Sequence, residues 1–247
     1  MLIAITVIIA LVDGAMYFLQ KNALPIGGDR DERSCLVAAG YSFDEQVGAC
    51  IRAFEMTPDI KQAAILAVEH VGGGYALTVT SFNSYEEAGS YDIMLERGEE
   101  RTKETVYIRQ GQVVEPQRVK IYYYNEERDR DEEGNIQCSK EGLVAVDRTI
   151  PPTQTPLKDS IELLIKGELI ASETERGITT EFPLDGVVLK GASITNGVAT
   201  LTFDDPKNKT SGGSCRVSVL WAQIEATAKQ FPAVQSVRFM PEEVFQP

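Results

Sequence analysis

Residues 212–241 read GGSCRVSVLWAQIEATAKQFPAVQSVRFMP and contain the clearest structural pattern of the chain. A helix is predicted from about Cys215 to Phe231, because apolar side chains recur there at helical spacing. These side chains form one stripe: Val217, Leu220, Trp221, Ile224, Ala228 and Phe231. Pro232 ends the helix, and Val234–Met240 has the composition of a strand. An apolar stripe needs a second layer to cover it, so the stretch predicts a helix packed on a sheet.

The residues before this stretch supply the rest of the same predicted domain, residues 117–247. They contain two strand-like runs, one helix and one hairpin, at Val119–Tyr124, Leu143–Ile150, Thr155–Gly167, and Val187–Ile194 with Val198–Phe203. Asn196-Gly197 is the favoured type I′ turn signal for the hairpin. The first two strands flank a polar insertion, Asn125–Gly142. We therefore predict two helices on one face of a small sheet.

A second, smaller domain is predicted over residues 35–116. Thr57 can cap a helix that runs from Pro58 to about His70 and ends at three glycines. Three strand-like runs follow it, at Tyr75–Phe82, Ser90–Glu96 and Thr105–Val114. The fold class is therefore α+β, with two small domains that each place helix on an antiparallel or mixed sheet. Pro116, in VVEPQRV, marks the boundary between them.

The first twenty residues are apolar except for Thr6, Asp13, Gly14 and Gln20. Their length suits one crossing of a bilayer, so residues 1–20 are predicted to be a transmembrane signal anchor, followed by a linker at 21–34. A cleaved signal peptide and a buried core helix remain as alternatives. The missing basic start and the lack of small residues at a suitable cleavage site argue against cleavage.

Four cysteines are split evenly between the two predicted domains. One disulfide per domain would join Cys35 to Cys50 and Cys138 to Cys215. Free thiols and a zinc site of four thiolates are the alternatives, although the spacing lacks any C-x-x-C pair. Disulfides need an oxidising compartment, whereas Lys21, which follows the apolar run, favours the opposite orientation. We give the cysteines more weight and expect a single-pass membrane protein with its bulk on the extracytoplasmic side.

Composition excludes some functions. The chain of 247 residues has 37 acidic and 24 basic side chains, a formal net charge of −13, which repels the phosphates of nucleic acids. Its one histidine, His70, excludes a zinc site of several histidines. Hydrophobic residues make up 43% of the chain, enough to bury a core. No nucleic acid partner is expected.

Several stretches together carry a family resemblance: VKIYYYN (119–125), LVAVDRTIP (143–151), TPLKDSIELLIKG (155–167), GITTEFP (177–183), LKGASITNGVATLTF (189–203) and residues 212–241. In composition and order they resemble a GerMN domain, a module of spore-germination and sporulation proteins, over about residues 119–241. The resemblance implies an α+β fold similar to the ring-building motifs of envelope machines, an extracytoplasmic location in bacteria and no enzymatic chemistry. The chain has one such domain rather than two. Residues 35–52 are similar to a small cysteine-bearing module of exported proteins.

The insertion contains a pattern similar to the first half of a calcium loop. Asp129, Asp131, Glu133 and Gly134 alternate as oxygen ligands and a turn glycine would, but Lys140 stands where a bidentate carboxylate is needed. A solvated acidic loop is therefore the favoured interpretation over a calcium site.

Four other residues, in three places of the chain, are candidate site residues. Glu69 and His70 could serve acid–base chemistry, but the glycines beside them mark a helix end, where a histidine meets the dipole favourably. Asn208 begins a glycosylation sequon, a short pattern that arises often by chance. Arg216 lies at the positive end of a helix dipole, so it is predicted to have a specific partner, such as an acidic group in its own domain, with ligand binding as the alternative.

The sequence predicts a membrane-anchored, non-enzymatic binding or assembly protein of the bacterial cell envelope. No catalytic, cofactor-binding or metal-binding residues are predicted, and no cofactor. The expected partner is an envelope protein, a second copy of the chain or the cell-wall polymer, reached through strand edges or stacking. The alternative is an exported cell-wall hydrolase that uses a carboxylate pair, which would need two acids at one cleft.

Overall fold

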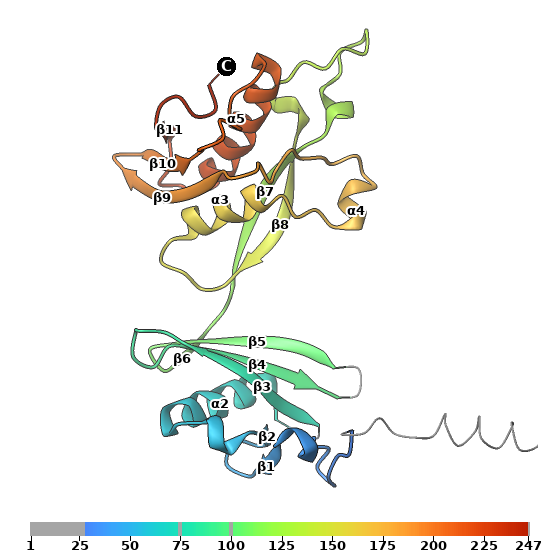
Figure 1. The fold of residues 1–247 in the computed structure, drawn as a ribbon, viewed down its shortest axis with the longest axis vertical. Coiled ribbons are helices and arrows are strands. Elements are labelled where there is room, and N and C mark those ends of the chain that lie inside the picture. The colour runs from blue at the N-terminus through green and yellow to red at the C-terminus, as the bar shows by residue number, and fades with distance from the viewer. Residues whose placement is uncertain (1–27, 74–75, 99–100, 247) are drawn as a thin grey trace, which may run out of the picture. The chain divides into compact units, whose positions relative to one another are not determined.

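The computed structural model describes residues 28–73, 76–98 and 101–246 (Figure 1). The chain divides into two compact units, the N-terminal unit Met1–Glu115 and the C-terminal unit Pro116–Pro247. The predicted anchor, residues 1–20, lies outside the described residues. Among the residues described, no helix has the length and apolar character that a bilayer crossing requires.

The described part of the N-terminal unit is one α-helix on a six-stranded mixed sheet. The strands, in sheet order, are β1 (Ser42–Asp44), β2 (Ala49–Ile51), β3 (Leu77–Ser84), β4 (Tyr91–Arg97), β5 (Thr102–Arg109) and β6 (Gln112–Val114). Neighbouring strands are antiparallel except β2 and β3, which are parallel. Helix α2 (Pro58–Val71) lies along the sheet (Figure 1), and short 3₁₀ helices span Val37–Ala39 and Ala53–Glu55.

Local signals place α2 where the sequence predicts it. The Thr57 hydroxyl accepts a hydrogen bond from the backbone N–H of Ile60 (3.4 Å), and the helix ends at Gly72, whose φ is 73°. The predicted strand Thr105–Val114 is wrong in one respect, because the structure divides it into β5 and β6. Gln110 and Gly111 both have positive φ and form the turn between them.

The C-terminal unit holds two sheets and two main helices. Its elements are β7 (Gln117–Tyr124), β8 (Leu143–Ile150), α3 (Pro156–Lys166), α4 (Ala171–Thr174), β9 (Val188–Thr195), β10 (Val198–Asp204), α5 (Ser214–Lys229) and β11 (Ser236–Met240), with 3₁₀ turns at Glu126–Asp129 and Lys140–Gly142. Strands β7 and β8 form an antiparallel pair. A separate sheet has the order β11-β10-β9, in which β10 and β11 are parallel. The prediction of one small sheet is therefore wrong.

The sheet is divided because α5 occupies the outer edge of β7. The Thr227 hydroxyl accepts from the backbone N–H of Tyr122 (3.1 Å). The Gln230 amide accepts from the N–H of Lys120 and donates to its carbonyl, both at 2.7 Å. Helix side chains thus make the hydrogen bonds that another strand would make.

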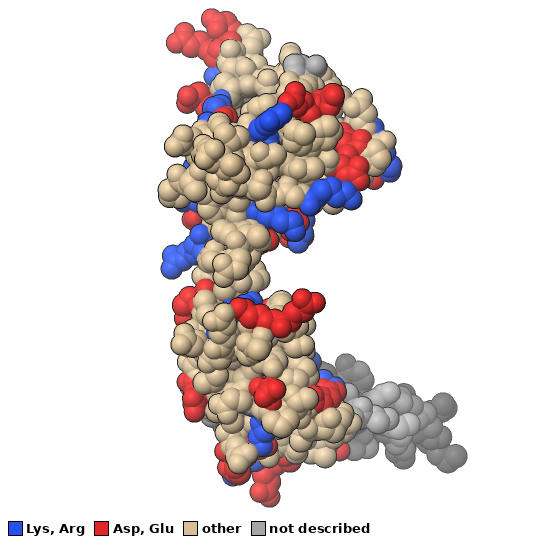
Figure 2. Space-filling model, turned by 90° about the vertical axis from the view of Figure 1, so that its left-hand side faces the viewer, with Lys and Arg blue, Asp and Glu red and all other residues tan. Residues whose placement is uncertain are grey.

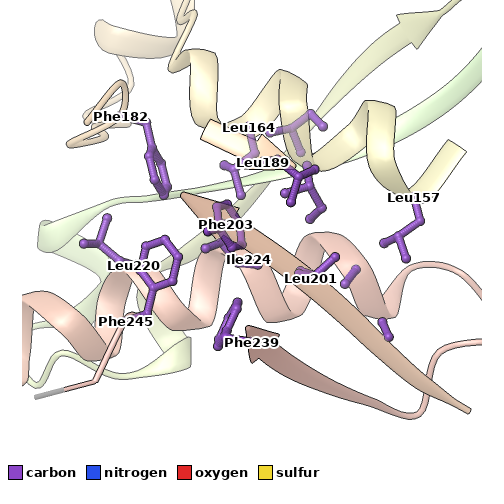
Figure 3. Close-up of a cluster of buried hydrophobic side chains, with 14 of the residues drawn as sticks. Leu157, Leu164, Phe182, Leu189, Leu201, Phe203, Leu220, Ile224, Phe239 and Phe245 are labelled. Carbon is purple, nitrogen blue, oxygen red and sulfur yellow. The ribbon is translucent and has the colours of Figure 1, made fainter. Parts of the chain in front are cut away.

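The core of the C-terminal unit is formed by α3, α5, the β7–β8 pair and the three-stranded sheet. Figure 3 shows Leu220 and Ile224 of α5 beside Phe203, Phe239 and Phe245. The rings of Phe203 and Phe245 meet edge to face at 5.1 Å between centroids. Phe245 belongs to the C-terminal tail and is fully buried, so the tail is part of this core.

Candidate binding groove at the start of helix α5

The insertion Asn125–Gly142 is attached to α5 by a covalent bond. The structure joins Cys138 to Cys215, 77 residues apart, with 5.2 Å between their Cα atoms. Lys140 also pairs with Glu225 of the same helix. The other disulfide, Cys35–Cys50, closes a loop of 15 residues in the N-terminal unit. All four cysteines are therefore in the predicted pairs, and neither free thiols nor a zinc site of thiolates is present.

A buried carboxylate holds the base of the insertion in place. Asp129 is 3% exposed and accepts hydrogen bonds from the Tyr124 hydroxyl, the Ser139 hydroxyl and the Ser139 backbone N–H (2.8 Å). Burial alone would raise the pKa of Asp129, but the donors from Ser139 and Tyr124 outweigh it and keep that pKa below its usual value. Gly142 is required here because a Cβ at this position would overlap the Tyr124 ring.

These contacts change the interpretation of the calcium-like pattern. The prediction of a solvated loop is wrong for Asp129, whose carboxylate is buried and used within the protein. Asp131 accepts from the Asn135 backbone N–H and from the Gln137 amide, both at 2.7 Å, while Glu133 is exposed. Within the described part of the chain, no cluster of three or more His, Cys, Asp or Glu side chains is placed to hold a metal ion.

A groove of about 560 Å³ opens between the insertion and the first turns of α5. Its lining comes from the end of β7, the insertion, the segment before β9 and α5: Tyr124, Glu126, Ile136, Thr179, Thr180, Glu181, Gly213, Cys215, Arg216, Val219 and Gln223. We call this set the α5 groove. Its volume lies within the range of about 300–1,000 Å³ that is typical of small-ligand sites. Cys215 belongs to the lining, so the disulfide forms part of the groove wall.

Each nitrogen of the Arg216 guanidinium has a partner at one side of the groove. Its Nε lies 2.7 Å from a carboxylate oxygen of Glu181, and its Nη atoms donate to the carbonyls of Ser211 (2.7 Å) and Lys209 (3.0 Å). The predicted acidic partner in the same domain is thus confirmed. The guanidinium holds the loop before α5 in place and is committed to these contacts.

Gln223 is the buried polar residue of the groove. It is 1% exposed, and its Nε2 donates to the Val219 carbonyl (3.3 Å). Its Oε1 has no hydrogen-bond partner among the residues described. Exchanging the amide atoms would point the oxygen at a carbonyl, so the assignment as drawn is the favourable one. The groove therefore contains a buried acceptor that calls for a donor.

The remaining sequence candidates form no site. His70 lies in the last turn of α2, with its Nε2 3.7 Å from a Glu115 carboxylate oxygen and its side chain 39% exposed. Glu69 contributes its backbone carbonyl to the end of the same helix. The Asn208 side chain accepts from the Ser211 hydroxyl (2.6 Å) in the loop before α5.

Sequence reasoning did not single out Gln223, although a signal was available. Gln223, Thr227 and Gln230 recur at helical spacing within α5, beside the apolar stripe. Such a row of uncharged polar side chains on a half-buried helix indicates a second buried face. Here Thr227 and Gln230 on this face accept hydrogen bonds from β7, and Gln223 lines the groove.

Comparison with known proteins supplies a family. Residues 120–243, half of the chain, match the family model Germane, described as sporulation and spore germination. Among solved structures the chain is similar to the first GerMN domain of the sporulation protein GerM from Bacillus subtilis, with 16% identity and a TM-score of 0.34, over 49% of this chain and 80% of that one. It is also similar to the tandem GerMN domains of that protein, with 17% identity and a TM-score of 0.38, over 82% and 71%. Comparison with curated proteins finds no match.

Proposed function

Because the chain belongs to the sporulation and spore germination family, as its resemblance to GerMN domains predicted, we propose that it is a non-enzymatic assembly protein of the bacterial cell envelope. In this proposal residues 1–20 tether it to the membrane, its bulk is extracytoplasmic, and the C-terminal unit binds a partner protein through the α5 groove.

The observation that carries the proposal is the composition of the groove. Ile136 and Val219 offer apolar contact, and the buried Gln223 offers an unpartnered acceptor. Apolar walls with a few placed polar groups are the usual composition of a recognition site. The disulfide and the Asp129 hydrogen bonds hold the walls in one arrangement before any partner arrives, which reduces the entropic cost of binding.

Three strand edges of the C-terminal unit, those of β7, β9 and β11, favour the groove over strand addition. Side chains of α5 already satisfy the outer edge of β7. Strand β9 has a register shift that leaves Lys190 as an extra residue opposite Thr202 and Phe203. A bulge and an edge lysine both discourage pairing with a further strand. On the other side, β11 is five residues long and carries Arg238.

Surface charge is consistent with binding at a defined groove. On the visible face of the C-terminal unit acidic and basic side chains are mixed, whereas acidic side chains predominate on that of the N-terminal unit (Figure 2). The formal net charge of −13 gives a general repulsion between copies at low salt. A heterologous partner is therefore favoured over a second copy.

Site-specific photocrosslinking in living cells tests the proposal. A photoreactive amino acid at Ile136, which is 36% exposed on the groove wall, should give a discrete protein adduct that mass spectrometry identifies. The matched control is Ile170, which is 58% exposed at the start of α4 and outside the groove. Equal adducts at both positions, or none at Ile136, would contradict binding through the groove.

A cell-wall hydrolase is the second candidate, and one observation favours it. Glu126 and Glu181 both line the α5 groove, so two carboxylates lie at one concave site. Glu181 is held in an ion pair by Arg216, which suits a fixed charge better than a proton donor. Release of soluble fragments from purified peptidoglycan, abolished by the double change Glu126→Gln and Glu181→Gln, would replace the binding proposal with this one.

A further inference from the structure

The charges of the α5 groove indicate the chemistry of its partner, an inference that rests on the proposed function. The one cationic side chain in the lining, Arg216, has its donors committed to Glu181, Ser211 and Lys209. Each of its three nitrogens already donates to a group of the protein, and its charge is paired with that of Glu181. An acidic partner would therefore find no unpaired cationic side chain in the lining.

Two acceptors of the groove have no partner within the described residues. Glu126 is exposed at the start of the 3₁₀ turn Glu126–Asp129 and has no ion-pair partner within the part of the chain that the structure describes. Gln223 adds a buried carbonyl oxygen without a donor. A carboxylate and an amide oxygen together call for a cationic group and an N–H.

The lining also has an apolar part. Ile136 of the insertion and Val219 of α5 are both partly exposed. Each lies close in sequence to one cysteine of the Cys138–Cys215 disulfide. Apolar surface of this kind is covered by an aliphatic side chain rather than by a sugar ring with its many hydroxyls.

We propose that the α5 groove binds a segment of polypeptide in which a lysine or arginine stands beside an apolar residue. The basic side chain pairs with Glu126, the apolar side chain covers Ile136 and Val219, and an N–H of the segment donates to Oε1 of Gln223. The general acidity of the chain attracts such a segment, and the single free carboxylate fixes where its charge docks.

An array of immobilised twelve-residue peptides, probed with the full chain, tests this proposal. The peptides carry Lys, Ser or Glu at a central position, each flanked either by leucines or by serines. We expect the peptides with lysine between leucines to bind about tenfold more strongly than those with glutamate in the same context. Replacing the flanking leucines by serine should remove most of the signal.

Three variants separate the groove from general electrostatics. Glu126→Lys should reverse the preference toward the glutamate peptides, a gain that misfolding cannot produce. Glu132→Lys makes the same change of charge at an exposed insertion position outside the lining and should leave the preference unchanged. Gln223→Met keeps the volume, removes the acceptor and should weaken binding of every peptide in the set.

The outcomes are distinct for the two proposals. Equal effects of Glu126→Lys and Glu132→Lys, a preference for acidic peptides, or no effect of Gln223→Met would overturn the proposed partner chemistry. If the photocrosslink at Ile136 forms while the array shows no preference for basic and apolar peptides, binding through the groove stands and this inference falls. If Ile136 gives no adduct in cells, the proposed function fails first.

Discussion

The two disulfides of the chain lie in different surroundings. Cys35 and Cys50 are both 0% exposed and lie beside the core of the N-terminal unit. Cys138 is half-buried and Cys215 is exposed, and this bond forms part of the α5 groove wall. A disulfide is thus part of the interior packing in the N-terminal unit. In the C-terminal unit the Cys138–Cys215 disulfide is a surface clamp, that is, a bond that fastens the insertion to α5 at the surface.

The difference shows what each bond holds together. The loop Cys35–Cys50 includes the short hairpin of β1 and β2, which is too small to bury a core of its own. The bond Cys138–Cys215 instead restrains a long insertion whose remaining contacts are a buried carboxylate and surface ion pairs. A clamp of the second kind can be opened while the rest of its unit stays folded.

Native-state reduction tests this comparison with the largest expected effect. Dithiothreitol should reduce Cys138–Cys215 about 10³-fold faster than Cys35–Cys50, because a thiolate reaches the buried bond only after an opening that costs on the order of 4 kcal/mol. Alkylation at timed intervals followed by peptide mass mapping measures both rates. Loss of the two bonds at one rate would remove the distinction between interior and clamp.

Removing the clamp should destabilise the C-terminal unit alone. On the chain-entropy account, Cys138→Ala with Cys215→Ala costs about 4 kcal/mol of unfolding free energy, because the bond closes a long loop. Urea unfolding followed by the fluorescence of Trp221 measures the effect, since this single tryptophan lies in α5. The control, Cys35→Ala with Cys50→Ala, should leave the Trp221 transition in place. A shift of that transition by the control pair would mean that the units do not unfold independently.

The two units also differ in how a buried carboxylate is paired. In the C-terminal unit both Nη atoms of Arg148 meet the Glu173 carboxylate at 2.6 Å, and the Glu173 side chain is 4% exposed. Arg148→Met would leave that carboxylate buried with its backbone donor alone, at a cost of about 3 kcal/mol. In the N-terminal unit, Arg109→Met should cost less, because the Tyr85 hydroxyl also donates to Asp92.

Thermal unfolding of the two variants by circular dichroism compares these pairs. The additional change Glu173→Gln in the Arg148→Met background should restore part of the stability, because it removes the unpaired charge. A larger loss from Arg109→Met than from Arg148→Met would contradict the assigned roles.

Removing a hydrogen bond at the outer edge of β7 should give a smaller loss of stability. Thr227→Val removes the acceptor of the Tyr122 N–H while it keeps the shape of the side chain, so we expect a loss of about 1 kcal/mol in the Trp221 transition. Thr202→Val is the same change at an exposed position of β10 and should alter stability little. Equal losses would show that the exchange of Thr for Val itself, rather than the missing acceptor, accounts for the change.

Lowering the pH should give the smallest and most gradual loss of stability in the C-terminal unit. The hydrogen bonds from Arg148 lower the pKa of Glu173. Burial would raise the pKa of Asp129, but the hydrogen bonds from Ser139 and Tyr124 outweigh burial and lower that pKa as well. A lowered folded-state pKa stabilises the fold above the unfolded values of 4.5 and 3.8, and this contribution is lost as pH falls through the folded pKa. The Trp221 midpoint in urea should therefore fall between about pH 5 and pH 3. The fall should be shallower in Arg148→Met, and an equally steep fall would exclude Glu173 as its source.

Part of the candidate site could be read before the structure was known. The even split of the cysteines predicted that Cys138 meets Cys215, and a mismatch with the helix dipole predicted an acidic partner for Arg216. Both arguments use rules that hold whatever the tertiary fold. Neither the groove nor the free oxygen of Gln223 followed from them, because both depend on where the insertion packs.

The sequence by itself determined the elements and their order. Helix α3 between Pro156 and Gly167 and strand β8 at Leu143–Ile150 depend on caps, turn residues and periodicities within a few residues. Only the tertiary structure decided that β7 stands apart from the sheet of β9, β10 and β11, and that Asp129 is buried. The physical reason is distance along the chain. The acceptor for the Tyr122 N–H is Thr227, 105 residues away, and no local pattern can show which remote side chain will satisfy a buried polar group.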